Sequence, residues 1–504
     1  MPLFLLLIMQ SNAQNNIYSK IIFNPGDDIL CYDMDYDFDT GFLLAGYHKL
    51  IKIDSAGDIV YSKRFSDNVE IRTVGKCSDS SSYMSGVIYN DSLHIYNLLI
   101  TKTDSAGNLL FAKSFNTGLH LNVNSACICH NDGIAICGYV NSGTVPNNKM
   151  LVARFSSNGD LLWEKTFTGG NRYNYAVDIK QQNDSSFVVL GTVQNGSPLP
   201  VTTRASLIKL DLTGNLIQAY TFETSNAMHS MGFGILTHNQ YLYCFISNNI
   251  IIKLNDSMQT DWCYSYNSFT GYGMWSYDFN PVKFHISSRG TIYHNGIGLN
   301  EIDTMGNEIS GWDAFLETQI EILETPDKGF LIAGNGPMML TKEKTLYMPH
   351  VGLIKSDSLG NTQNCAYVWY YSQKTPVSMY LTTDTIIEET SGLNSVSINV
   401  SYNSYPSFSD FGCVDVSGNE QGNSTENEFV IFPNPTNGII NISPYSQINS
   451  YTVKVIDIAG KTVMNALNCS SGQFDISGLN NGVYFIEINI NSICYHYKVV
   501  LMQI

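Results

Sequence analysis

Short segments of alternating hydrophobic and polar positions recur along the chain, separated by turns rich in Asp, Asn, Ser and Gly. The clearest copies end in an aromatic residue and cover residues 51–65, 100–115, 153–167 and 208–222, with weaker copies at 252–266 and 299–315. Alternation with a period of two is typical of a half-buried strand. Each copy therefore predicts a hairpin, in which Asp caps the turn and Gly adopts positive φ.

A second predicted hairpin precedes most copies, as at residues 39–46, 130–138 and 326–334. The turn glycines Gly57, Gly107, Gly159 and Gly214 follow one another at intervals of 50, 52 and 55 residues. Four strands in about 50 residues is the size of a β-propeller blade. The sequence thus predicts an all-β fold with a seven-bladed β-propeller over residues 14–365.

The strand count also predicts how the ring closes. Segments typical of a third strand occur near residues 50, 100, 152, 208, 252, 300 and 353, but only six segments typical of a fourth strand follow them. Residues 17–23 resemble the fourth-strand segment at 60–65. We therefore expect residues 17–23 to pair beside residues 351–357 and to close the seventh blade, because closure leaves no open sheet edge there.

The lengths of the predicted connections divide the ring into two faces. The turns within each hairpin are tight, whereas the connections on the opposite face are long, as at 139–149, 192–204, 266–276 and 335–350. Loops on a rigid scaffold commonly carry specificity. The candidate ligand-binding residues of this face are Tyr272, Trp275, Arg172 and Tyr173. They are suited to stacking on sugar rings or anchoring a protein partner, and packing beneath a neighbouring blade is the alternative.

Composition narrows the classes of partner. Lys and Arg total 27 against 44 Asp and Glu, giving a net charge of −17, so nucleic acid is not expected as a ligand. No segment approaches the roughly 18 continuous apolar residues of a transmembrane helix. Residues 1–13 are typical of a signal peptide that lacks its basic start, with Ser11 and Ala13 at the cleavage site.

Candidate metal sites are weak, and we expect neither a metal nor another cofactor. Asp33, Asp35, Asp37 and Asp39 alternate, but Phe38 and Leu44 replace the Gly and Glu of a calcium loop, which favours a solvated strand face. The cluster Cys127, Cys129 and Cys137, with His130 beside it, is suited to metal binding or, more commonly, to a sheet interior. Cys365 and Cys413 are candidates for a disulfide in an oxidising compartment.

Catalytic signatures are missing from the sequence: it has no nucleophile elbow, paired-histidine zinc motif, phosphate-binding loop or dinucleotide fingerprint. The expected function is non-catalytic binding of an extracellular glycan or protein. The alternative is a secreted polysaccharide hydrolase or lyase with acidic residues at the mouth of the channel. Two or more carboxylates in one pocket on the long-loop face favour the alternative, and an uncharged aromatic patch there favours binding.

Beyond the repeats, the sequence predicts three further segments. Residues 366–413 contain alternating stretches and are expected to form a small β spacer against the ring, and the polar stretch 414–428 is a linker. Alternating strands separated by Gly and Asn turns then predict a small Ig-like β-sandwich over residues 429–504.

This last segment resembles the type A C-terminal sorting domain of the type IX secretion system of Bacteroidetes. The matching positions are Phe432, Pro433, Asn434, Pro435, Gly438, Asp457, Gly460, Lys461, Leu479, Gly482, Tyr484 and Lys498. The resemblance implies that the type IX machinery is a partner, and that the cargo passes through the periplasm and across the outer membrane. It further implies that the domain is usually removed on arrival, leaving the cargo secreted or attached to the outer cell surface.

Overall fold

The computed structural model describes residues 18–23, 30–141, 148–182, 185–196, 201–224, 230–246, 250–267, 283–294, 299–312, 318–335, 351–357, 373–376, 379–384, 386–390, 392–396, 400–404, 408–411, 430–432, 436–443, 451–457, 461–469, 473–490 and 493–501. The chain divides into two compact units, Met1–Ser417 and Gly418–Ile504. Every regular element in the described ranges is a β-strand. No helix among these residues is long and apolar enough to cross a membrane.

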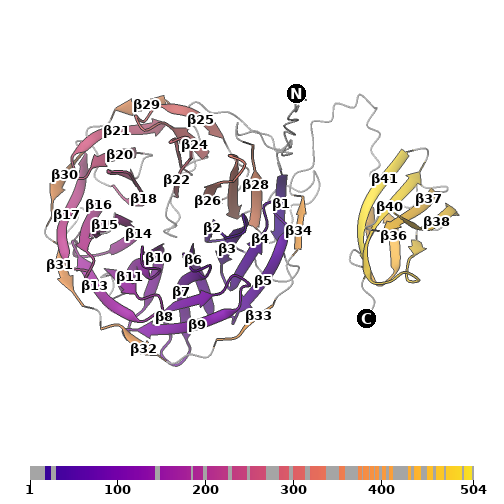
Figure 1. Cartoon of the computed structure of the whole chain (residues 1–504), viewed down its shortest axis with the longest axis horizontal. Helices are drawn as coiled ribbons and strands as arrows, with labels where there is room; N and C mark the ends of the chain where they lie inside the picture. The colour runs from indigo at the N-terminus through magenta and orange to yellow at the C-terminus, as the bar shows by residue number, and fades with distance from the viewer. Residues whose placement is uncertain are drawn as a thin grey trace, which may run out of the picture. The chain divides into compact units, whose positions relative to one another are not determined.

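The first unit is a β-propeller: seven antiparallel sheets, counted over the described residues, are arranged in a ring (Figure 1). We call the region along the ring axis, bordered by the innermost strands, the channel. From the channel outward, the first sheet contains β2 (Asp33–Tyr36), β3 (Phe42–Gly46), β4 (Lys49–Ile53) and β5 (Ile59–Phe65), and the second contains β6 (Val69–Lys76), β7 (Ser82–Asn90), β8 (Ile95–Thr103) and β9 (Leu109–Asn116). The third contains β10 (Leu121–Ile128), β11 (Ile134–Asn141), β12 (Asn148–Phe155) and β13 (Leu161–Thr168). The fourth contains β14 (Asn174–Gln182), β15 (Ser186–Asn195), β16 (Thr202–Asp211) and β17 (Leu216–Thr224). The fifth sheet contains β18 (Gly232–His238), β19 (Tyr241–Ile246), β20 (Ile250–Asn255) and β21 (Thr260–Asn267). The sixth contains β22 (Phe284–Ile286), β23 (Ile292–His294), β24 (Leu299–Ile302) and β25 (Glu308–Trp312). The seventh contains β26 (Thr318–Glu324), β27 (Phe330–Asn335) and β28 (Val351–Lys355).

The first strand of the chain completes the seventh sheet. β1 (Tyr18–Phe23) pairs with β28 from Tyr18 opposite Lys355 to Ile22 opposite Val351. The predicted pairing is thus confirmed for residues 18–22 with residues 351–355. Ring closure joins the two ends of the repeat region through a continuous ladder of backbone hydrogen bonds.

Six short strands, which we call the belt (residues 373–411), extend the sheets outward. They are β29 (Gln373–Pro376), β30 (Met379–Thr383), β31 (Ile387–Glu389), β32 (Asn394–Val396), β33 (Tyr402–Ser404) and β34 (Phe408–Phe411). They pair in turn with the fifth, fourth, third, second, first and seventh sheets. The segment predicted as a spacer therefore forms outer strands of six sheets and belongs to the propeller unit.

The hairpin turns repeat one local structure. Oδ1 of Asp54 accepts hydrogen bonds from the backbone N–H groups of Ala56 and Asp58, and Gly57 follows with a φ of 77°. A Cβ atom on Gly57 would lie 2.5 Å from the ring of Tyr18 in the neighbouring sheet, so both the turn and the packing require glycine. The equivalent glycines Gly107, Gly159, Gly214 and Gly306 lie against Tyr61, Phe111, Trp163 and Tyr264 in the same way.

The hydrophobic cores lie between neighbouring sheets. Between the second and third sheets, for example, Leu98, Ile136, Leu151 and Phe155 are fully buried in one cluster. Each sheet is covered on both faces by its neighbours, which explains the nearly continuous hydrophobic second and third strands.

The second unit is built from two antiparallel sheets in the described residues. One contains β35 (Val430–Phe432), β36 (Ile439–Ser443) and β39 (Gln473–Asp475), and the other contains β37 (Tyr451–Asp457), β38 (Thr462–Cys469), β40 (Gly482–Ile490) and β41 (Ile493–Leu501). Its core includes Ile440, Val453, Val455, Ile486 and Val499.

Candidate functional site

The long-loop face of the propeller is the edge where first strands begin, second strands end and third strands begin. Near this edge, four side chains form what we call the tyrosine–arginine stack: Tyr139 of the third sheet, Arg172 and Tyr173 of the loop between β13 and β14, and Tyr175 of the fourth sheet. The guanidinium carbon of Arg172 lies 5.8 Å from the ring centroid of Tyr173. The rings of Tyr173 and Tyr175 are stacked with centroids 5.7 Å apart, and Tyr139 meets Tyr175 edge-on at 5.0 Å. All four side chains are half-buried.

The loop that presents this stack is held by Asn174, which is fully buried. Its Oδ1 accepts hydrogen bonds from the N–H groups of Gly169 and Gly170, at 3.1 and 2.8 Å. Its Nδ2 donates to the carbonyl oxygens of Asn148 and Gly170, both at 2.9 Å. A side-chain amide has two donors and one acceptor oxygen with two lone pairs, so all are used. The loop is therefore ordered before any ligand arrives.

A second aromatic group, the aromatic rim (Tyr89, His94, Tyr96 and His120), lies at the same edge of the second and third sheets. The ring centroids of Tyr89 and Tyr96 are 5.1 Å apart, and those of Tyr96 and His120 are 5.6 Å apart. His94, Tyr96 and His120 are exposed. Asn122, two residues beyond His120, contacts the hydroxyl of Tyr139 at 3.4 Å and so lies between the rim and the stack.

The structure brings together two of the four ligand-binding residues predicted from the sequence. Arg172 and Tyr173 are neighbours in the stack, whereas Tyr272 and Trp275 lie outside the described residues. Tyr139 and Tyr175 were not predicted. The spacing of Tyr173 and Tyr175 places both on one side of an extended segment and could have identified Tyr175. Nothing in the sequence places Tyr139, on a different sheet, beside them.

The central channel carries the second candidate site. Strand register defines one equivalent position on the innermost strands. In the first four sheets and the seventh it lies directly opposite a residue that precedes a glycine, and in the fifth it lies opposite Phe245, which precedes Ile246. These positions are Asp33, Thr73, Ser125, Asp178, Gly234 and Glu321, with Lys283 at the corresponding place just before β22. Four of the seven are ionisable, although the channel is enclosed by the sheets (Figure 1).

An ion-pair triad joins the sixth, seventh and first sheets at this level. Nζ of Lys283 lies 2.6 Å from Asp33 and 3.3 Å from Glu321. All three side chains are largely buried, with the carboxylates each 8% exposed. The triad crosses the place where the ring closes. A buried cation shared by two carboxylates stabilises their juxtaposition, and removing it would leave two like charges together.

The aspartates of the channel also connect neighbouring innermost strands. Asp33 accepts a hydrogen bond from the backbone N–H of Val74 at 2.9 Å, and Asp178 accepts one from the N–H of Ile235 at 2.9 Å. Asp35 accepts from the N–H of Lys76 at 2.8 Å. Each carboxylate thus links its own sheet to the next. The sequence interpretation of Asp33, Asp35 and Asp37 as a solvated strand face is wrong, because they lie in buried hydrogen bonds and ion pairs.

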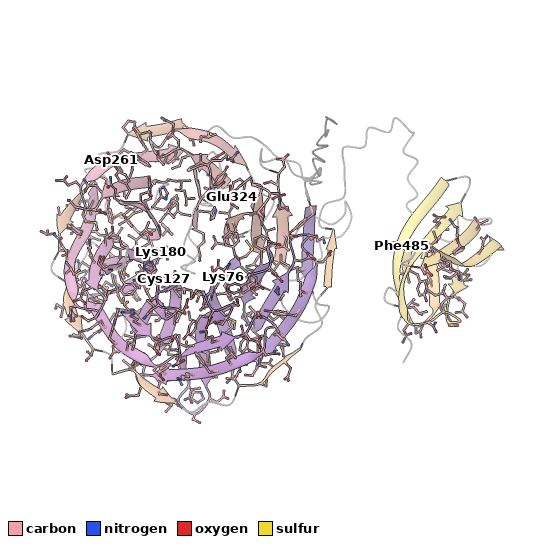
Figure 2. The ribbon with its side chains drawn as sticks, viewed as in Figure 1. Lys76, Cys127, Lys180, Asp261, Glu324 and Phe485 are labelled. Atoms are coloured by element: carbon pink, nitrogen blue, oxygen red, sulfur yellow. The ribbon has the colours of Figure 1, made fainter. Side chains whose placement is uncertain are left out.

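These carboxylates border a cavity of about 260 Å³ that is also lined by Lys76, Lys180 and Lys283. Figure 2 shows Lys76, Cys127 and Lys180 around the channel, while Asp261 lies on the outer rim. Lys76 is the last residue of β6, next to the tight turn, so the cavity occupies the half of the channel toward the tight-turn face. It is separate in position from the tyrosine–arginine stack.

Burial changes the ionisation of two channel carboxyl groups. Burial raises the pKa of Glu321 to about 8; Lys283 opposes this rise and Asp33 adds to it. Burial likewise raises the pKa of Asp35 to about 6, although hydrogen bonds from Lys76 and Tyr36 oppose it. A raised pKa means that the folded state favours the protonated carboxyl group.

The raised pKa of Glu321 predicts a pH dependence of stability. The contribution of Glu321 to the free energy of unfolding is fully present below pH 4.5, the ordinary pKa of a glutamic acid side chain. This contribution is lost as the pH rises through about 8, the pKa in the folded state. We expect the wild-type free energy of unfolding to fall between pH 5 and 9 by more than that of Glu321→Gln, by on the order of a few kcal/mol. Urea unfolding of both chains, with Glu324→Gln on the same strand as control, measures the difference. Equal pH slopes in all three chains would contradict the prediction.

The cysteine cluster lies inside the propeller. Cys129 and Cys137 are buried in the core between the third and fourth sheets, with Cys127 packed against it, and all three are free thiols. No group of three or more His, Cys, Asp or Glu side chains among the described residues is arranged to hold a metal ion. Cys365 and Cys413, the proposed disulfide, lie outside the described residues.

The C-terminal motif residues stabilise the small two-sheet unit. The φ of Gly438 is 133°, and a Cβ there would lie 2.4 Å from the Cβ of Ser477. The hydroxyl of Tyr484, whose ring is in the core, donates to the carbonyl of Asn480 at 2.7 Å. The N–H of Lys461 donates to Oδ1 of Asp457 at the β37–β38 turn, and Leu479 packs against the core. Gly482 is the first residue of β40, and Lys498 of β41 pairs with Phe485 of β40. The other motif residues, Pro433, Asn434, Pro435 and Gly460, lie outside the described residues.

Residues 430–502 match the family model described as secretion system C-terminal sorting domain. This part of the chain is a type IX sorting domain. It implies export, with the mature protein secreted or at the cell surface. The sorting domain covers only the second unit, so it says nothing about what the propeller binds.

A comparison with curated proteins finds no match. Among solved structures, the chain is similar to a protein of unknown function from Bacteroides caccae, with 12% identity, 58% of this chain and 93% of that chain covered, and a TM-score of 0.35. It is also similar to the Pan2 WD40 domain of Neurospora crassa (10% identity, 64% and 89% covered, TM-score 0.42) and to BamB from Moraxella catarrhalis (10%, 66% and 99%, 0.39). Because these identities and TM-scores are low, the propeller is described from its own sheets and strand register alone.

Proposed function

We propose that the chain is an exported seven-bladed β-propeller that binds an extracellular glycan or protein on its long-loop face. In this proposal residues 1–13 are a signal peptide and residues 14–365 form the ring, with 366–413 wrapped around it. Residues 414–428 link the ring to an Ig-like sorting domain at 429–504 that engages the type IX secretion machinery. The ligand is held outside the cell, where the sorting domain directs the protein.

The tyrosine–arginine stack is the observation that carries this proposal. Tyrosine and arginine dominate recognition surfaces because each combines an apolar body with a polar tip. Here they come from two sheets of a rigid ring, on a loop already ordered by Asn174. Because little conformational entropy remains to be lost on binding, such a site favours affinity.

A polysaccharide hydrolase or lyase is the second candidate, favoured by the presence of Asp33, Asp35, Asp178 and Glu321 around one cavity. Glycoside hydrolysis needs a carboxyl group that faces the scissile bond as an acid and a second one as a base or nucleophile. Both oxygens of Asp33 and of Asp178 already accept hydrogen bonds from protein groups. This arrangement supports a structural role for these carboxylates and places the binding proposal first.

The test is binding of the purified full chain to an array of polysaccharides and glycoproteins, followed by product analysis of every hit. We expect binding without cleavage and a loss of at least tenfold in affinity for Tyr173→Ala, because a tyrosine anchor typically contributes more than 1 kcal/mol. Leu162→Ala, an exposed position at the opposite end of the third sheet, is the matched control. Trp275→Ala tests the remaining sequence prediction.

The outcomes separate the two candidate functions. Released fragments that disappear in Glu321→Gln or Asp33→Asn would establish the hydrolase or lyase in place of the binding protein. Binding that is equally strong in Tyr173→Ala and wild type would remove the stack from the proposed site.

A further inference from the structure

The arginines of this chain provide the starting point, because there are six and all lie in the described ranges. Four guanidinium groups lie 2.7–3.6 Å from a carboxylate: those of Arg64, Arg72, Arg204 and Arg289. The fifth, Arg154, donates to the carbonyl oxygen of Leu212 at 2.8 Å. Arg172 differs from all of these, since its guanidinium meets the face of Tyr173 and no oxygen acceptor among the described residues.

The backbone around Arg172 is fixed on both sides. Its own N–H donates to the carbonyl of Gln194 at 3.0 Å, and the N–H of Gln194 donates to the carbonyl of Tyr173 at 2.8 Å. Asn171 makes two hydrogen bonds to the neighbouring loop: its N–H donates to Oδ1 of Asn195, and its Oδ1 accepts from the N–H of Gly196. Together with Asn174, these contacts hold the backbone that carries Arg172 at a defined place on the face.

The chemistry beside Arg172 distinguishes between kinds of ligand. A guanidinium is a planar set of donors that matches a carboxylate in bidentate geometry, and it cannot be deprotonated in a protein. The ring of Tyr173 lies next to the guanidinium, and the stack continues through Tyr175 to Tyr139, whose hydroxyl contacts the amide of Asn122. These rings and this amide suit sugar faces and hydroxyl groups. Among the large exposed aliphatic side chains, Leu110, Leu162 and Ile217 lie near the tight turns, whereas Leu93 lies on the long-loop face beside the aromatic rim.

We propose that the tyrosine–arginine stack binds a carboxylated polysaccharide, with the carboxylate of a uronic-acid unit on the guanidinium of Arg172 and the sugar beside Tyr139 and Tyr175. The net charge of −17 opposes polyanions in general, so selectivity must come from this local cation and not from long-range attraction. This inference rests on the proposed binding function and specifies its ligand class.

The experiment compares polygalacturonate with its fully methyl-esterified form, which keeps the same backbone and removes the charge. Affinity of the full chain for each polymer is measured by affinity electrophoresis and calorimetry, for wild type, Arg172→Gln and Arg172→Lys. We expect wild type to prefer the acidic polymer at least tenfold. Arg172→Gln should lose roughly 10- to 100-fold for the acidic form alone, because a hydrogen bond to a charged group contributes about 1.5–3 kcal/mol. Arg172→Lys should recover only part of this loss.

Arg64→Gln, which removes a guanidinium that is paired with Asp67, serves as the matched control and should bind as wild type does. Equal affinity for the acidic and esterified polymers would overturn the carboxylate inference while leaving the binding function intact. Binding of poly-glutamate that depends on Arg172, with no binding of either polysaccharide, would assign the site to an acidic peptide instead. Failure to bind any member of the glycan and glycoprotein array would count against the binding function itself.

Discussion

A chain that lacks residues 373–411 is expected to aggregate and to unfold at a markedly lower temperature than the full chain. Removal of the belt exposes the edges of six sheets, whose backbone N–H and C=O groups are then free to pair with other molecules. It also uncovers core positions that Met379, Ile386 and Leu393 now cover. Size-exclusion chromatography and thermal unfolding measure both effects. A monomeric deletion variant with an unchanged midpoint would show that the belt does not stabilise the ring.

A single substitution separates the packing of the belt from its backbone pairing. The ring of Tyr402 lies 4.5 Å from that of Phe65, and burial raises the pKa of its hydroxyl, whose oxygen has no hydrogen-bond partner among the described residues. Tyr402→Ala should therefore lower the free energy of unfolding by about 3 kcal/mol, as truncation of a buried aromatic ring does. Tyr402→Phe keeps the ring, and we expect it to be as stable as wild type.

The second large effect is expected from Lys283→Met. This change keeps most of the side-chain volume but leaves Asp33 and Glu321 buried without the ammonium group that lies between them. Loss of one partner of a buried ion pair costs about 3–5 kcal/mol, and here two carboxylates are affected. Urea unfolding at pH 9, above the pKa of about 8 that burial gives Glu321, should show a decrease of that size in the free energy of unfolding.

A double-mutant cycle tests whether the loss comes from the uncompensated charge. In the double variant, Glu321→Gln removes one of the two buried carboxylates that Lys283→Met leaves without a cation. We expect the double variant to be more stable than Lys283→Met alone. Lys454→Met, which removes a half-exposed lysine of the sorting domain paired with Glu487, should cost less than 1 kcal/mol. A single change at Lys283 that costs no more than this control would contradict the role of the triad in closing the ring.

Much of the propeller follows from local sequence. The Asp-to-Gly turns, such as Asp54 to Gly57, specify hairpins through hydrogen bonds within a few residues, and the surplus third strand predicts that β1 completes the seventh sheet. The belt could not be predicted in this way. Its strands are short, and their partners are far away in the chain, as with Tyr402 opposite Phe65, so no local pattern identifies the pairing.

The candidate sites were predicted less completely than the fold, for the same reason. Arg172 and Tyr173 are adjacent in the sequence and were found there, but Tyr139 reaches the stack from another sheet through the register of β11. Likewise, Asp33 and Lys283 meet only because the ring brings the first and sixth sheets to one channel. Sequence reasoning identified residues suited to each role and could not determine which of them lie together.

Hydrogen–deuterium exchange of the full chain, with and without a polysaccharide bound on the array, tests the central claim most directly. Binding at the long-loop face predicts protection of residues 169–175 and 89–96, with no change at the tight turns 54–58 and 104–108. Protection confined to the channel segments 33–36 and 318–324, with residues 169–175 unchanged, would contradict the account and move the site to the carboxylates of the channel.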